Sequence, residues 1–264
     1  MLVREAARDA PEPIEVYMIR RQKGMRFLGG YYAFPGGRVD ATDGSPDLLA
    51  RCRGLDAAEA EAILSYADGV PSQAESSPVP ALAYWVTVAR ELLEESGVLL
   101  GCGADGHAIV AGSPDVADAI ERVRKGLMAG EASFAELLQR EGWYCDLGPL
   151  RYLSHFITPR SSPIRFSARF FLCPVPPGQL PRLFTEETSE GFWISPGDGY
   201  RRFLADAMAM AEPAEYGLAY LAQFDSLEAL WAAHVDRRHK FHGIIDRIDV
   251  FWEKFDWRES RWRS

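Results

Sequence analysis

The chain has 264 residues, of which 47% are hydrophobic and 25% are charged, which is enough apolar material for a sizeable core. Its formal net charge of −9 argues against a nucleic acid or an anionic membrane surface as the main partner. The sequence has neither an unbroken apolar stretch of about 18 residues nor an apolar signal core near its start. Its cysteines lie far apart without C-x-x-C spacing, so we expect reduced thiols in a cytoplasmic protein without a membrane partner.

The first part of the chain predicts two short strands around a basic loop. The strands are expected at 14–20 and 31–34, where aliphatic and aromatic residues gather. Residues 21–30 between them are basic and contain glycine. Pro35-Gly36-Gly37 follows the second strand. It predicts either an ordinary turn or a loop whose glycines let a ligand approach the backbone closely.

Residues 44–80 form a segment of mixed character. Apolar, Ala-rich stretches at 47–52 and 56–66 predict helices. The polar stretch that follows, 67–80, predicts a loop. We therefore expect a mainly helical segment that ends in a loop.

The stretch 81–98 predicts one helix, which ends at a glycine suited to a helix C-terminus. Glu91, Glu94 and Glu95 lie at i, i+3 and i+4, so their carboxylates share one side of this helix. Because like charges at this spacing repel, a divalent cation among the carboxylates explains the cluster. The alternative is a solvated face, since Glu is a good helix former and is usually exposed.

The second half of the chain predicts a helix at 118–140 and two adjacent strands within 150–175. A short strand is expected at 186–194. Helices are expected at 198–210 and 216–233. The aromatic C-terminal segment gives no clear pattern.

Residues 90–98 read R-E-L-L-E-E-S-G-V. They fit, position by position, the second half of the Nudix box, which is R-E-U-x-E-E-x-G-U with U an aliphatic residue. The chain therefore resembles the Nudix hydrolases. With Gly37 as the first glycine of the box, Asp43 falls where the family has Glu. In the family seven residues separate this position from the arginine, whereas here an insertion of about 39 residues splits the box. A similar interruption occurs in the subgroup that contains the peroxisomal coenzyme A diphosphatase.

The resemblance implies an α/β fold, the Nudix α/β/α sandwich with a mixed β-sheet. Residues 1–264 are expected to form a single Nudix hydrolase domain. The box insertion, about 44–80, is expected to be helical. A helical C-terminal extension is expected at about 198–264. The sequence leaves open whether the chain forms a homodimer.

The resemblance also implies that Mg²⁺ or Mn²⁺ is held by the helix glutamates. Glu94 and Glu95 are expected to be metal ligands, and Glu91 a further ligand or the catalytic base. A backbone carbonyl of Gly37 or of its neighbour Gly36 completes the metal shell in this interpretation.

Two further residues are expected to act in catalysis. Arg90 is expected to pair with a box glutamate and to orient it, the alternative being a helix-surface contact with Glu94. The family often uses a carboxylate from outside the box as base or ligand. We expect Glu190 in this role rather than Glu186 or Glu187, the alternative being a solvated acidic loop.

The arginines outside the helix carry the prediction of the substrate. Coenzyme A-cleaving members have an extra motif before the Gly-Gly loop, approximately L-L-T-x-R-(S/A)-x3-R-x3-G-x3-F-P-G-G. Arg21 and Arg26 keep its spacing, whereas residues 17–19 and Gln22 depart from it. Both arginines suit a phosphate, which a guanidinium binds by paired hydrogen bonds. The alternative is a basic loop on a solvated edge.

A second arginine-bearing stretch, residues 158–171, also resembles the interrupted-box subgroup. Its Arg160 and Arg169 are expected to bind substrate. With the aromatic residues around them they suit a nucleotide or pantetheine groove, or alternatively a buried sheet edge.

The predicted partner is a small-molecule diphosphate, and the predicted reaction is metal-assisted attack of water on it. For coenzyme A or an acyl-CoA the products are a 4′-phosphopantetheine and 3′,5′-ADP. The alternatives are a dinucleotide, a nucleotide sugar, ADP-ribose or a dNTP as substrate. A Nudix-fold binding module without catalysis is a further alternative, against which the intact box carboxylates argue.

Overall fold

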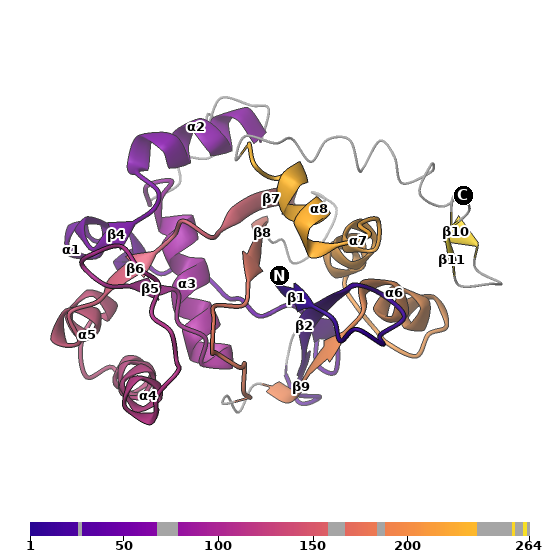
Figure 1. The fold of residues 1–264 in the computed structure, drawn as a ribbon, viewed down its shortest axis with the longest axis horizontal. Coiled ribbons are helices and arrows are strands. Elements are labelled where there is room, and N and C mark those ends of the chain that lie inside the picture. Colours follow the sequence, from indigo (N-terminus) through magenta and orange to yellow (C-terminus); the bar gives the residue numbers. More distant parts are fainter. Residues whose placement is uncertain are drawn as a thin grey trace.

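The structure is a computed structural model. It describes residues 1–25, 28–67, 79–157, 167–183, 188–236, 255–256 and 261–262. A six-stranded mixed sheet stands between helix α3 (Ala83–Ser96) and the helices α6 (Pro196–Leu204) and α7 (Glu212–Leu221) (Figure 1). This arrangement of layers confirms the expected α/β/α sandwich.

The sheet is built around its second strand. Its members are β1 (Leu2–Glu5), β2 (Ile14–Arg21), β3 (Tyr32–Ala33), β7 (Arg151–Ile157), β8 (Ser167–Pro174) and β9 (Thr188–Ile194). The order along the sheet is β3-β2-β1-β8-β7. The sixth strand, β9, lies outside this order and pairs with the edge of β2 that faces away from β1. β1 runs parallel to β8, whereas the other pairs are antiparallel, so the sheet is mixed.

Strand β2 is buried on both faces between Val16 and Ile19, and this stretch contains no charged residue. Tyr17 and Ile19 enter the core that includes α3. Val16 and Met18 point the other way and enter the core that includes α6 and α7. A residue of β9 lies on the same face of the sheet as the β2 residue directly opposite it. The alternation along β2 therefore shows which side of the sheet each β9 side chain occupies.

Helix α3 begins and ends close to the predicted limits. Its buried stripe includes Trp85 and Leu93, both of which are almost fully removed from solvent. Burying one such side chain contributes about 1.5–3 kcal/mol. The helix ends at Gly97, whose φ of 69° lies in the left-handed region that favours glycine, and its N–H donates to the Leu93 carbonyl.

The helices on the opposite face differ in detail from the prediction. α6 ends at Leu204 rather than continuing to residue 210. The stretch predicted as one helix at 216–233 is split into the end of α7 and α8 (Leu227–Ala233). Ser226 explains the break, because its hydroxyl accepts the Ala229 N–H and starts a new helix.

The box insertion is part of the core rather than an appendage. It contains α1 (Pro46–Ala50), β4 (Cys52–Arg53) and α2 (Ala57–Ala67), and the short 3₁₀ helix η1 (Ala41–Gly44) precedes it. The prediction of a helix up to Cys52 is wrong at its end, because Cys52 pairs in parallel with Cys145 of β6 (Tyr144–Asp146). Such pairing between residues far apart in sequence overrides a local Ala- and Leu-rich pattern.

The remaining elements complete the side of the molecule that carries the insertion. β5 (Gly101–Cys102) joins β4 and β6 in a small sheet. The helix predicted at 118–140 is two helices, α4 (Pro114–Met128) and α5 (Phe134–Arg140). Near the C-terminus, β10 (Phe255–Asp256) pairs with β11 (Arg261–Trp262).

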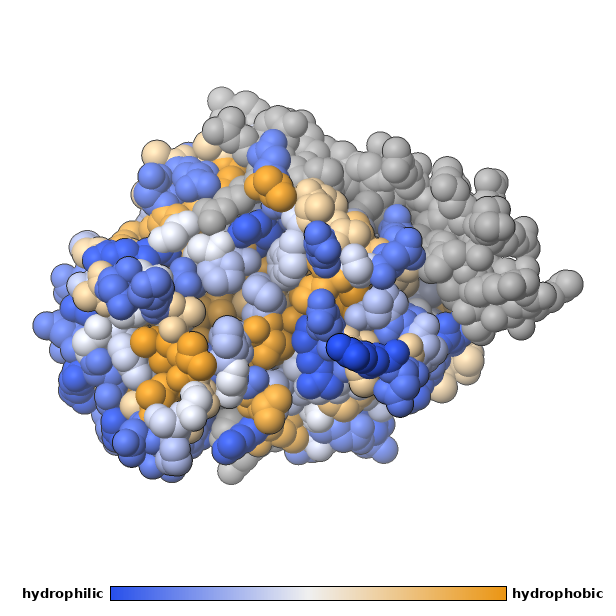
Figure 2. All heavy atoms as spheres, in the orientation of Figure 1, coloured by the Kyte–Doolittle hydropathy of each residue, from blue (hydrophilic) through white to orange (hydrophobic). Residues whose placement is uncertain are grey.

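The surface is mostly hydrophilic on the face that Figure 2 shows, with smaller hydrophobic areas between the polar side chains. Within the described residues, the helices are too short or too polar to cross a bilayer.

Candidate active site

The two halves of the split box meet in the structure. The backbone N–H of Gly36 donates to Glu95 Oε2 at 2.7 Å. Gly37 lies so close to Glu91 that a Cβ at position 37 would overlap the Glu91 carboxylate. The loop after β3 and the partly buried side of α3 that carries the glutamates therefore form one site, although the insertion separates them in sequence.

Arg90 is the hub of this site. Its Nε and Nη2 donate to the two carboxylate oxygens of Asp43 at 2.7 and 3.0 Å. Its Nη1 donates to Glu91 Oε1 at 2.9 Å and to Glu94 Oε2 at 3.1 Å. Nη2 also donates to the backbone carbonyl of Arg38 at 2.8 Å. One guanidinium thus fixes the loop, the 3₁₀ helix and two helix glutamates relative to one another.

Asp43 is completely buried and has a hydrogen-bonding partner that the sequence did not reveal. The Thr87 hydroxyl donates to Asp43 Oδ2 at 2.7 Å, and the backbone N–H of Asp40 donates to the same oxygen at 2.9 Å. Asp is one methylene shorter than the Glu that the family has at this position. Thr87 lies one helical turn before Arg90, so both side chains reach Asp43 from the same face of α3. Asp43 therefore positions Arg90, and Thr87 helps to hold it.

Burial governs the ionisation of the site. It raises the pKa of Glu91 and of Glu94 above the usual value, while Arg90 opposes the shift. Burial alone would lower the pKa of Arg90, but hydrogen bonding to Asp43 and the charges of Glu91 and Glu94 raise it overall. The carboxylates are thus held close together at an electrostatic cost that an added cation would relieve.

The donor set fits a hard divalent cation such as Mg²⁺ or Mn²⁺, because carboxylate and carbonyl oxygens are the ligands that these ions prefer. Among the described residues, however, no three acidic, histidine or cysteine side chains are already arranged around one point as a metal shell. The reason is visible in the contacts, since Glu91 and Glu94 face Arg90 and Glu95 faces Gly36. These three glutamates would hold a cation after their carboxylate ends turn.

Gly37→Ala is expected to lower kcat/KM by about 10–100-fold without unfolding the protein. The three atoms nearest the added methyl group all belong to the Glu91 carboxylate, the far end of a flexible side chain, so the fold can absorb the change. The displaced carboxylate, however, belongs to the site. Steady-state kinetics and thermal unfolding measure the two effects separately. Gly112→Ala is the control, because its backbone does not require glycine and a Cβ there comes no closer than 3.7 Å to Val110. An unchanged kcat/KM would show that the position of Glu91 does not matter.

Four arginines were predicted to bind substrate, and the structure describes two of them. Arg21 ends β2, and its Nε is buried. Arg169 lies in β8 with its guanidinium carbon 4.1 Å from the centroid of the Tyr84 ring. Arg26 and Arg160 lie outside the described residues.

Glu190 is not brought together with the helix glutamates. It lies in β9 directly opposite Arg20 of β2, and the two side chains form an ion pair at 2.9 Å. The Arg20 guanidinium also stands over the ring of Tyr32, which packs against the core on the α6 and α7 side. Glu190 therefore faces away from α3. The other two candidates, Glu186 and Glu187, lie outside the described residues.

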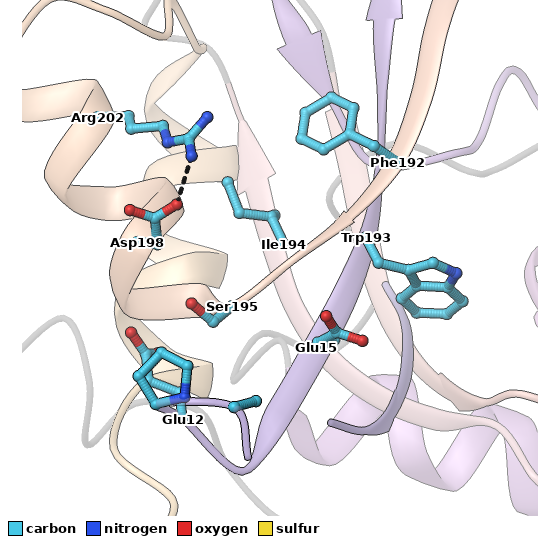
Figure 3. Close-up of a pocket in the computed structure, with 10 residues that line it drawn as sticks. Glu12, Glu15, Phe192, Trp193, Ile194, Ser195, Asp198 and Arg202 are labelled. Atoms are coloured by element: carbon cyan, nitrogen blue, oxygen red, sulfur yellow. Dashed lines mark ion pairs between the residues drawn. The ribbon is translucent and has the colours of Figure 1, made fainter. Parts of the chain in front are cut away.

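A hollow of about 200 Å³ lies at the end of β9 and the start of α6, and none of its lining residues belongs to the box (Figure 3). Its charged side chains already have partners. Arg202 pairs with Asp198 at 2.8 Å. Glu15 pairs at 2.7 Å with Arg4, whose guanidinium lies over Trp193. The hollow is therefore separate from the box residues and is lined by charged side chains that pair with one another or with their neighbours.

Comparison with known proteins identifies the family of this chain. The family model described as the NUDT19 Nudix domain matches residues 2–221. A chicken (Gallus gallus) protein named acyl-coenzyme A diphosphatase NUDT19 is 28% identical over 263 residues, which cover 87% of this chain and 68% of that protein. The human (Homo sapiens) protein of the same name is 28% identical over 247 residues, covering 83% and 64%. The chain thus spans about two thirds of the length of these relatives.

A solved structure shares the fold. The crystal structure of a NUDIX hydrolase from Alicyclobacillus acidocaldarius superimposes with a TM-score of 0.66 and 29% sequence identity. The match covers 88% of this chain and 92% of the other.

Proposed function

This chain belongs to the NUDT19 Nudix domain family and is a Nudix diphosphatase, and from that premise we propose that its substrate is coenzyme A or an acyl-CoA. Water would add across the P–O–P bridge and release a 4′-phosphopantetheine and 3′,5′-ADP. The names of the chicken and human relatives support this substrate class.

One observation carries the catalytic part of the proposal, namely the assembly of Glu91, Glu94 and Glu95 against the Gly36–Gly37 loop around Arg90. We propose that these three glutamates hold Mg²⁺ or Mn²⁺. When bound, such an ion neutralises phosphate charge and lowers the pKa of a bound water.

The residues of the chain would share the remaining work. Arg90 keeps Glu91 and Glu94 oriented, and Asp43 keeps Arg90 in place. Glu91 is the nearest of the expected bases to the loop, since it contacts Gly37. Burial raises its pKa, which makes it a better proton acceptor than an exposed carboxylate.

A substrate panel tests the function. The purified protein with Mg²⁺ or Mn²⁺ is given coenzyme A, an acyl-CoA, a dinucleotide, a nucleotide sugar, ADP-ribose and a dNTP. We expect the highest kcat/KM on coenzyme A or its acyl ester, with 3′,5′-ADP identified by mass spectrometry. A preference for ADP-ribose or a dNTP would overturn the proposed substrate. Absence of hydrolysis across the panel would instead favour a binding module.

We also propose that residues 1–264 form one domain, because the insertion and α3 share a core. Leu55 and Ile63 of the insertion pack in the same cluster as Trp85 and Leu93. The net charge of −9 supports a small-molecule partner rather than a nucleic acid.

A further inference from the structure

The loop that carries Gly36 and Gly37 has one anchor in the core. Within residues 31–42, all of which the structure describes, Phe34 alone is buried. Its side chain belongs to the core cluster on the α6 and α7 side of the sheet. Two residues further on, the Gly36 N–H donates to Glu95 of α3 at 2.7 Å. The place of the Phe34 ring therefore limits where the loop can lie against α3, because the chain between them is short.

Helix α7 makes room for this ring by having no side chain at Gly217. This glycine is buried in the middle of α7, where glycine is a poor helix former. A Cβ at position 217 would lie 2.8 Å from Phe34 Cε2, 3.1 Å from Phe34 Cζ and 2.8 Å from Met1 Sδ. Carbon atoms pack at about 3.5–4.0 Å. The ring therefore occupies the space that any other residue at position 217 would need.

The segment that precedes α7 also holds the strand that leads into the loop. The Tyr32 N–H donates to the Ala209 carbonyl at 2.8 Å, and Tyr32 pairs with Met210. β3 itself has only two residues and pairs with β2. The segment 209–217 therefore contacts both Tyr32 and Phe34, and α7 lies across the sheet from α3 (Figure 1).

The Phe34 ring has little freedom to yield. It is 8% exposed, and it stands edge-on to the Phe170 ring of β8, with 6.3 Å between the centroids. Protein interiors are close-packed, so a methyl group added beside the ring displaces it. The Met1 side chain, in contrast, is flexible and can shift. Displacement of the Phe34 ring moves the backbone that continues into Pro35 and Gly36.

We propose that Gly217 is a positioning residue of the active site. By leaving room for the Phe34 ring, it sets how closely the Gly36–Gly37 loop approaches the glutamates of α3. This inference rests on the proposed function, in which the loop and the glutamates act together, and it extends the working parts of the site to α7. A misplacement of about 1 Å can cost about 100-fold in rate even when the substituted residue lies far from the chemistry. Gly217 acts through Phe34 rather than on the substrate.

The test is a double-mutant cycle of Gly217→Ala and Phe34→Leu. Leucine lacks the Cε2 and Cζ atoms that a Cβ at position 217 would meet, so the double variant exchanges the end of the ring for a methyl group and nearly conserves volume. The values of kcat and KM are measured on the best substrate of the panel, and thermal unfolding reports stability. Gly126→Ala is the matched control. Gly126 is also buried in a helix, and a Cβ there would lie 2.7 Å from Leu137 Cδ2, but between α4 and α5.

We expect Gly217→Ala to lower kcat by about tenfold or more, with a smaller change in KM. Phe34→Leu alone should also lower kcat, because the loop loses contacts of its anchor. The double variant should recover most of the loss, and Gly126→Ala should keep the kcat of the wild type. Wild-type kcat in Gly217→Ala, an equal fall in Gly126→Ala, or no recovery in the double variant would overturn this inference and leave the proposed function standing.

A crystal structure of Gly217→Ala gives a second measure that needs no turnover. The distance from Gly36 N to Glu95 Oε2, 2.7 Å in the wild type, should increase. An unchanged distance would overturn the inference. If the wild type hydrolyses no substrate of the panel, the proposed function falls, whereas this distance still decides whether Gly217 sets the place of the loop.

Discussion

Glu94→Gln is expected to lower kcat by at least about 100-fold while the protein stays folded. The substitution removes one negative charge from the carboxylate cluster that would hold the cation, and an amide oxygen is a weaker ligand. Folding should be retained because burial raises the pKa of Glu94, so the folded state already disfavours the charged form. The Gln side-chain oxygen can still accept the hydrogen bond from Arg90 that Glu94 accepts at 3.1 Å.

Three measurements make this result specific. Turnover is measured on the best substrate of the panel. Thermal unfolding reports whether the variant is folded, and isothermal titration calorimetry measures the binding of Mn²⁺. Glu141→Gln is the control. Glu141 also pairs with an arginine, Arg122, at 3.1 Å, but it lies at the C-terminal end of α5 rather than in the box. Wild-type turnover in Glu94→Gln would remove Glu94 from the site. Lost turnover with lost folding would show that the residue is structural.

The box helix could be predicted from the sequence because its signals are local. The apolar spacing, the glutamate triplet and the terminal glycine all lie within the stretch 81–98, and the structure has α3 there. The arrival of Gly36 and Gly37 beside these glutamates is likewise what the split motif predicted. The role of Thr87 could not be found in this way, because its partner Asp43 is distant in sequence.

The sheet shows where local signals are insufficient. β1 (Leu2–Glu5) was not predicted, since its four residues acquire their strand conformation from β2 and β8 on either side. The strand that holds Glu190 was predicted, but its orientation was not. Phe192 packs in one core and Trp193 against the other, so alternation in the sequence does not distinguish the two faces. Only the register with β2 shows that Glu190 lies on the side away from α3.

Asp43→Asn is expected to lower the free energy of unfolding by about 3 kcal/mol, the largest loss of stability among these variants. Asp43 is completely buried, and it accepts hydrogen bonds from two nitrogens of the Arg90 guanidinium. Asn has the same shape but no charge, and its amide group would present donors to a guanidinium that has only donors. Glu91 and Glu94 still contact Arg90, which keeps the expected loss at the lower end for a broken buried pair.

Urea unfolding with linear extrapolation measures this loss, and kcat on the same samples measures the effect on the site. Asp198→Asn is the control, because Asp198 pairs with Arg202 at 2.8 Å where both side chains are substantially exposed. An exposed pair is worth about 1 kcal/mol or less. Equal losses in the two variants would mean that Asp43 stabilises no more than a surface partner does. If Asp43 holds Arg90 in place, Asp43→Asn should lose more free energy of unfolding than Asp198→Asn. It should also have a lower kcat, because the Arg90 guanidinium orients Glu91 and Glu94.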